Sequence, residues 1–353
     1  MTHRPERREP LPRPLPVPTR SAEAPRRPAA WAKSGAKPVA KPVFPPGAVE
    51  PVRAAETGPR LGLALGGGSA RGWAHIGVIR ALEEAGLAPA VVAGCSIGAV
   101  VGACYAAGRL DRLESFARSL TRGRVVRLVD PRLPGSGLIA GNRLRRRLLT
   151  DLGDSRIETL RIAFGCVATE FGTGAEVALT EGPLVEAVRA SYAIPGLFPP
   201  VDIAGRFFMD GTLVNPVPVA LARALGADVV VCVNLNGDTG GPVVREVTAP
   251  TPRRGLLHAV RGRLPGFART PPEAAPLPGI ASVVLDAFNI TQDRISRARL
   301  ERDPPDVAIG PDVAAFGLFD FHRAADGIAL GYSAARTALP RIRAALDGAA
   351  ARV

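Results

Sequence analysis

The chain has few of the residues that build metal-bound or disulfide-stapled proteins. Its four cysteines, Cys95, Cys104, Cys166 and Cys232, form no CxxC pair, and its four histidines lie far apart among 353 residues. A zinc framework and a disulfide scaffold are therefore not expected. The same scarcity favours a reducing compartment.

Acidic residues are also scarce, since 45 Lys and Arg oppose 32 Asp and Glu, a net charge of +13. All three lysines and 14 of the 35 prolines lie in residues 1–60, which carry a net charge of +7. Such a segment buries too little apolar surface to order itself, so we predict a disordered basic arm at 1–58. It contains no apolar run typical of a secretory signal. We expect a cytoplasmic protein, with the arm either an inert tail or a contact with the inner face of the membrane.

The apolar pattern changes sharply at Leu61. A run at 61–65 predicts a buried strand, and helical spacing at 70–85 predicts a helix that ends at Gly86. A further strand at 90–93 and a helix ending near 107 follow. The rest of the pattern predicts strands at 161–169, 176–180, 206–209, 228–234 and 306–309, and helices at 183–192, 282–299 and 322–338. This order is typical of an α/β fold with a mostly parallel sheet, over 59–345, with an irregular segment at 237–279.

Residues 85–108 contain no charged side chain, which allows a second interpretation. About 20 apolar residues suffice to cross a bilayer, and Gly94, Gly98 and Gly102 form a GxxxGxxxG run that could pack helices in lipid. A buried strand followed by a buried helix accounts for the same residues. Pro89 and the Ala/Gly-rich composition favour the buried strand and helix over a membrane span.

Residues Gly94-Cys95-Ser96-Ile97-Gly98 form a GxSxG motif between a predicted strand and a predicted helix. In that context a tight turn exposes the serine hydroxyl at a helix N-terminus, so Ser96 is a candidate nucleophile. Alternatively, Ser96 only caps the helix. The neighbouring Cys95 is also a candidate nucleophile. Alternatively, it is a small buried residue that only packs in the core.

A second glycine-rich loop, Gly66-Gly67-Gly68-Ser69-Ala70-Arg71-Gly72, follows the first strand. Trp73 occupies the position where a P-loop needs lysine, and no acidic residue occurs between Glu84 and Asp111 to bind a dinucleotide ribose. What remains is a row of backbone N–H groups able to hold an oxyanion. Arg71 either braces this loop or lies near the anion.

The third element is Asp210-Gly211-Thr212 at a predicted strand end, which by itself indicates a turn. The order Ser96, Asp210, His322 would match the chain order of an α/β-hydrolase triad. However, those enzymes reach the nucleophile after several strands, and here only one strand precedes that of Ser96. A carboxylate is then the available base for the serine. His75 lies within the first predicted helix, where packing explains it.

Together these motifs, with Ser191-Tyr192-Ala193-Ile194-Pro195-Gly196 and Asp303-Pro304-Pro305-Asp306, resemble the patatin-like phospholipases. The similarity covers about 61–339 and points to the bacterial branch that groups with neuropathy-target-esterase-type proteins. It implies a three-layer α/β/α fold and a Ser96–Asp210 dyad without histidine. It also implies an oxyanion hole at Gly66, Gly67, Gly68 and Arg71, with Gly72, Gly94, Gly98 and Gly211 as motif glycines. The usual Asp-Gly-Ala/Gly appears here as Asp-Gly-Thr.

The resemblance implies a serine hydrolase of lipid acyl esters that needs no metal or organic cofactor. A catalytically silent lipid-binding or regulatory protein of the same fold is the alternative. A specific nucleic-acid partner is not expected, because aromatics make up 5% of residues and no recognition module occurs. Arg143, Arg145, Arg146 and Arg147 form either a contact for an anionic membrane or a solvated helix face.

Overall fold

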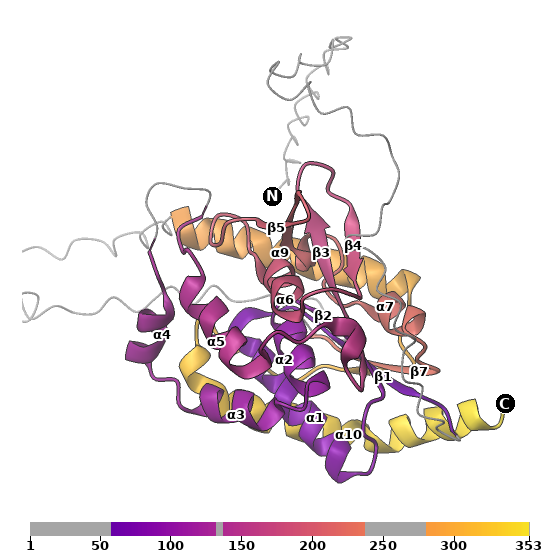
Figure 1. The fold of residues 1–353 in the computed structure, drawn as a ribbon. Helices are drawn as coiled ribbons and strands as arrows, with labels where there is room; N and C mark the ends of the chain where they lie inside the picture. The colour runs from indigo at the N-terminus through magenta and orange to yellow at the C-terminus, as the bar shows by residue number, and fades with distance from the viewer. Residues whose placement is uncertain (1–57, 132–136, 237–279, 353) are drawn as a thin grey trace, which may run out of the picture. The chain divides into compact units, whose positions relative to one another are not determined.

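The computed structural model describes residues 58–131, 137–236 and 280–352, all within one unit that spans Pro42–Val353. The predictions for the arm at 1–58 and the irregular segment at 237–279 fall outside these residues, apart from Gly58. Figure 1 shows the described part as a sheet with helices packed against it.

The described strands form one mixed sheet in the order β5-β6-β3-β2-β1-β7-β8, with β4 also paired to β3. Neighbours from β3 to β8 along this order run parallel, whereas β4, β5 and β6 pair in the antiparallel sense. The strands are β1 (Leu61–Leu65), β2 (Val91–Cys95), β3 (Ala163–Glu170), β4 (Glu176–Leu179), β5 (Val201–Ile203), β6 (Arg206–Asp210), β7 (Val229–Val233) and β8 (Val307–Ile309). All seven predicted strands are confirmed. The three-residue β5 was not predicted, because so short a run carries little period-two signal.

Helices cover both faces of the sheet and give the three-layer α/β/α fold. Side chains of α1, α2, α6 and α10 share one apolar cluster with Leu63 and Leu65, whereas α7 packs on Ala64 of the other face, where Leu300 of α9 also lies. The helices are α1 (Ala74–Glu84), α2 (Ile97–Ala106), α3 (Leu110–Arg118), α4 (Arg122–Leu128), α5 (Asn142–Leu152), α6 (Leu184–Tyr192), α7 (Val219–Ala224), α9 (Ile280–Arg302) and α10 (Ala324–Ala350). Short 3₁₀ helices are η2 (Ser69–Trp73), η3 (Ile157–Thr159), η4 (Gly211–Leu213) and η5 (Phe321–Arg323).

The last helix is longer than predicted. It continues past 338 and through Pro340 to Ala350. Proline removes one hydrogen bond from a helix, and here tertiary packing holds the helix together across that gap. α10 crosses α1 so closely that a Cβ added to Gly77 or Gly331 would lie 1.9 Å from a carbonyl oxygen of the other helix.

The uncharged stretch at 85–108 is not a membrane span. It folds as the buried strand β2 and the ten-residue helix α2. A Cβ at Gly98 would lie 2.1 Å from the carbonyl oxygen of Leu65, so this glycine brings α2 against β1 and not against another helix in lipid. Among the described residues, no helix combines the length and apolarity needed to cross a membrane.

Candidate active site

Two strands meet end to end within the sheet. β2 pairs with β3 as far as Cys95 opposite Val167, and β6 pairs with β3 from Asp210 opposite Ala168. β4 takes the other edge of β3 over 166–169, so β2 and β6 must share one edge. Their carboxyl ends therefore face each other at adjacent positions of β3, which brings residue 96 beside residue 210.

Ser96 lies at a sharp turn from β2 into α2. Its φ is 53° and its ψ −121°, a strained conformation for a residue other than glycine. The flanking glycines permit the turn: a Cβ at Gly94 would lie 2.5 Å from Ala99 Cα, and Gly98 is held against β1. The predicted strand–turn–helix context of the GxSxG motif is therefore present.

The Ser96 hydroxyl is directed at Asp210. Ser96 Oγ donates a hydrogen bond to Asp210 Oδ2 at 2.7 Å. Ser96 is 5% exposed and Asp210 is completely buried. Burial raises the pKa of Asp210 to about 6, although hydrogen bonds from Ser96 and Thr212 act in the opposite direction. A carboxylate with a pKa close to neutral can both accept and return a proton near physiological pH.

The second oxygen of Asp210 is held by Thr212, a role that we did not predict. Asp210 Oδ1 accepts hydrogen bonds from Thr212 N at 2.8 Å and from Thr212 Oγ1 at 2.7 Å. Gln292 on α9 is buried and donates from Nε2 to Thr212 Oγ1 at 3.0 Å. The hydroxyl that distinguishes Asp-Gly-Thr from the usual motif thus bonds directly to the carboxylate. The sequence offered a weak signal here, namely that departure from the usual residue.

Ser191 supports the backbone of the turn. Its Oγ accepts from the Ser96 N–H at 3.0 Å and donates to the Val167 carbonyl at 2.7 Å. Ser191 is completely buried near the end of α6. This accounts for the serine of the Ser-Tyr-Ala-Ile-Pro-Gly motif, to which the sequence analysis assigned no role.

The glycine loop after β1 passes beside the serine. A Cβ at Gly67 would lie 2.2 Å from Thr212 Cγ2 and 3.6 Å from Ser96 Cβ, so only glycine fits there. Gly72 packs on Ile97, whose side chain would lie 2.2 Å from an added Cβ. Glycine at these positions therefore lets the loop approach the start of α2.

The N–H groups of this loop are not equivalent. Those of Gly66 and Gly67 donate to backbone carbonyls at 3.1 and 3.0 Å, so they are engaged within the fold. Within the described part of the chain, the N–H groups of Gly68, Ser69 and Ile97 meet no acceptor. The expectation that Gly66 and Gly67 donate to an oxyanion is thus at odds with the structure, whereas Gly68 keeps a free donor.

Arg71 and His75 hold the loop in place. The buried Arg71 side chain donates to the carbonyl oxygens of Leu235 and Phe316, each at 3.4 Å, which favours bracing over contact with an anion. His75 Nε2 donates to the Gly66 carbonyl at 2.8 Å. Burial lowers the pKa of His75 to about 4, so its imidazole is neutral near pH 7. Its packing role is as predicted.

Ser96, Asp210 and His322 do not form a catalytic triad, although their order in the chain would allow one. His322 lies in η5, where its Nε2 accepts from Arg122 Nε at 3.3 Å, while Asp210 bonds directly to Ser96. Cys95 is completely buried, and burial followed by the nearby Asp210 raises the pKa of its thiol well above the ordinary value. Such a thiol is a poor nucleophile. Its small size suits contact with Gly211, where a Cβ would lie 3.0 Å from Cys95 Sγ and 2.2 Å from the Val167 carbonyl oxygen.

Comparison with known proteins identifies the family. The model of the patatin-like phospholipase family matches residues 63–223. An uncharacterized NTE family protein of Mycobacterium tuberculosis is 34% identical over 329 residues, which cover 80% of this chain and 91% of that protein. The chain belongs to the patatin-like phospholipase family, and within it to the group of NTE family proteins.

Two further proteins match the chain less completely. A lysophospholipase of the fungus Coccidioides immitis is 31% identical over 294 residues, which cover 81% of this chain and 18% of that protein. Among solved structures, VipD from Legionella pneumophila matches 82% of this chain and 68% of its own, with 14% identity and a TM-score of 0.43. Membership of the patatin-like phospholipase family supports a lipid hydrolase.

Proposed function

We propose that the protein is a serine hydrolase of lipid acyl esters that works through a Ser96–Asp210 dyad and an acyl-enzyme. The observation that carries this proposal is the 2.7 Å hydrogen bond from Ser96 Oγ to Asp210 Oδ2, at a strained turn with free N–H groups nearby. Membership of the patatin-like phospholipase family supports a lipid substrate.

In the acylation step, Ser96 Oγ attacks the carbonyl carbon of the ester while its proton passes to Asp210. The carbonyl oxygen becomes an oxyanion as the C–O π bond breaks. When the tetrahedral intermediate collapses, the alcohol leaves and takes the proton back from Asp210. The acyl chain then remains on Ser96 as an ester.

Deacylation repeats these steps with water. Asp210 accepts a proton from water, whose oxygen attacks the acyl carbon, and Ser96 leaves with that proton. The products are a fatty acid and the free enzyme. No additional base is needed, because Asp210 holds the proton in one half of the cycle and returns it in the other.

The oxyanion needs donors that are free before the reaction. The N–H groups of Gly68, Ser69 and Ile97 meet that condition, and Ile97 directly follows the serine, as in the usual oxyanion hole of hydrolases with a nucleophile elbow. Each such donor stabilises the transition state by about 3–4 kcal/mol in well-studied cases. Gly66 and Gly67 contribute by fixing the loop.

Thr212 sets the proton affinity of the base. The Thr212→Val variant keeps the shape but loses the hydroxyl that bonds Asp210 Oδ1, so the pKa of Asp210 should rise. We expect the acidic limb of the pH profile of kcat/KM to move to higher pH by about one unit, the effect of losing roughly 1.4 kcal/mol. Thr212→Ser should restore the wild-type limb, which separates loss of the hydrogen bond from loss of packing. An acidic limb that stays in place in Thr212→Val would contradict this role.

The neighbouring Cys95 thiol has little part in that limb. The Cys95 thiol stays protonated, because burial raises its pKa. Asp210 is therefore the group that we expect to titrate near pH 6.

A lipid screen tests the proposed function. Purified protein is incubated with lysophospholipid, diacyl phospholipid, triacylglycerol and acyl thioester, and fatty acid release is measured by mass spectrometry. We expect release from at least one acyl lipid, with lysophospholipid the first choice because of the relatives. The Ser96→Ala protein is the blank. No release from any class, by a protein shown to be folded, would favour the catalytically silent lipid-binding alternative.

A further inference from the structure

A second candidate site lies on another part of the described surface. A cavity of about 770 Å³ lies between α3, α4 and α5, and it is lined by neither Ser96 nor Asp210. Phe116, Leu120 and Leu128 give it apolar lining. Four arginines also line it, namely Arg112, Arg124, Arg127 and Arg147. We call this cavity the arginine groove.

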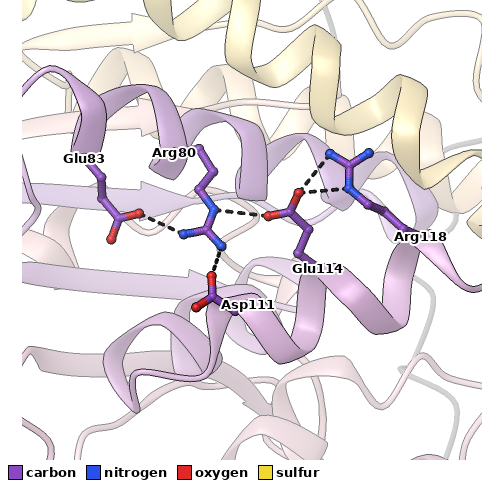
Figure 2. A network of polar contacts seen from close by, with 5 residues as sticks. All are labelled: Arg80, Glu83, Asp111, Glu114 and Arg118. Atoms are coloured by element: carbon purple, nitrogen blue, oxygen red, sulfur yellow. Dashed lines mark hydrogen bonds and ion pairs between the residues drawn. The ribbon is translucent and has the colours of Figure 1, made fainter.

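The two acidic residues of the groove are paired with arginines. Asp111 bonds to Arg80 of α1, which also holds Glu83 and Glu114, as Figure 2 shows. Asp151 forms an ion pair with Arg147 at 2.9 Å. The network in Figure 2 has three carboxylates against two guanidinium groups, a net charge of −1. The three remaining arginines of the groove outweigh it, so the groove keeps a net positive charge.

Three of those arginines are exposed and available. The side chain of Arg124 is bonded only to the Ser119 carbonyl, at 3.1 Å. The side chains of Arg112 and Arg127 have no hydrogen-bond or ion-pair partner among the described residues. By contrast, most of the arginine run on α5 is engaged, since Arg145 pairs with Glu186 at 2.8 Å. The expected patch at 143–147 is thus mostly tied into the fold, and the free positive charge lies on α3 and α4.

Helix α4 is basic and lies entirely at the surface. It contains three arginines and no acidic residue, and none of its side chains is buried. Val126 on this helix is 70% exposed, although the transfer of a valine side chain out of water lowers its free energy. Figure 1 shows α4 beside α3 and α5 at the edge of the described fold.

A segment that follows α4 is hydrogen-bonded to the loop after α6. After α4, the chain returns at Leu138 and Ile139, whose N–H groups donate to the carbonyls of Gly196 and Leu197 at 3.1 and 2.8 Å. That loop follows α6, which carries Ser191 beneath Ser96. Leu138 is 63% exposed, so this segment also presents an apolar side chain to the surface.

We propose that the arginine groove and α4 dock on the anionic headgroups of a phospholipid bilayer, with Val126 and Leu138 entering its interface. Guanidinium groups bind phosphate oxygens, often in pairs, and clustered arginines favour an anionic surface. The proposal rests on the proposed lipid hydrolysis and deepens it, because docking would hold the enzyme at the surface that contains its substrate. Binding itself requires no turnover.

The test uses the full chain carrying Ser96→Ala, so that the lipid stays intact. Sedimentation is measured with vesicles of phosphatidylcholine alone and of equimolar phosphatidylcholine and phosphatidylglycerol. We expect binding to the anionic vesicles, and a loss of at least about tenfold in affinity for Arg112→Glu/Arg127→Glu. The matched control is Arg341→Glu/Arg352→Glu, which makes the same charge change at exposed positions in and after α10. This control should lose less than the groove pair.

Three results would overturn the proposal. They are equal binding to both vesicles, an equal loss in the groove pair and the control pair, and release of bound vesicles by soluble glycerol phosphate at a matched headgroup concentration. The last result would make the groove a site for a small anion. Hydrolysis of a soluble short-chain ester, measured with Ser96 intact, should be unchanged by Arg112→Glu/Arg127→Glu. If no variant and no wild type hydrolyses any ester while vesicle binding persists, the proposed function fails and the docking surface stands.

Discussion

Asp210→Asn is expected to lower kcat/KM for ester hydrolysis by about 10²–10⁴-fold, the usual loss for a general base. At the same time it should make the protein more stable near neutral pH, because the wild type buries a carboxylate whose pKa is raised to about 6. A rise from 3.8 to about 6 corresponds to about 3 kcal/mol of unfavourable free energy for the ionised form. Asparagine keeps a carbonyl to accept from Thr212 but carries no charge.

The gain in stability should depend on pH in a defined direction. Below about pH 4 the carboxyl is protonated in both the folded and unfolded chain, so the two proteins should differ little. Between about pH 4 and pH 6 the unfolded chain loses the proton first, and the wild type loses stability relative to the variant. Above about pH 6 the full difference should be present.

Thermal and urea unfolding of both proteins across this pH range measures that difference. Asp202→Asn, which removes an exposed carboxylate on β5, is the matched control for the loss of one acidic side chain. A variant that is inactive but less stable than the wild type at every pH would show that Asp210 has a structural role. A variant with wild-type turnover would remove Asp210 from the dyad.

Ser96→Ala is expected to reduce esterase activity by about 10⁴-fold or more, because the acyl-enzyme cannot form. The fold should persist, since the change removes one hydroxyl and leaves the backbone bond from Ser96 N to Ser191 in place. Cys95→Ala is the matched control at the neighbouring position. It should keep activity within a small factor, because its buried thiol is protonated. If Cys95→Ala were inactive and Ser96→Ala active, the nucleophile would be the cysteine.

The sequence was sufficient for much of the fold because its buried strands are strongly apolar and its turns are marked by glycine. α3, α4, α5 and α7 were not predicted. α5 reads as a run of arginines, but in the folded chain it buries Leu148 and Leu152, and Arg145 pairs with Glu186 of α6. α4 buries no side chain, so it has no apolar stripe to detect.

The candidate site was predictable where local sequence fixes local geometry. The glycines around Ser96 determine the turn, and this is visible in five residues. The meeting of Ser96 and Asp210 depends on β2 and β6 sharing one edge of β3, an arrangement that no local pattern records. The support from Gln292 spans 80 residues of chain, and the engagement of Gly66 and Gly67 depends on distant carbonyls. These features follow from tertiary structure alone.

The most direct test of the central claim is labelling with a fluorophosphonate, followed by mass mapping of the adduct. Only an activated serine reacts quickly with such a probe. We expect one adduct on Ser96 in the wild type, slower labelling in Asp210→Asn, and none in Ser96→Ala. An adduct on another residue, or no adduct in a protein shown to be folded, would contradict the Ser96–Asp210 account.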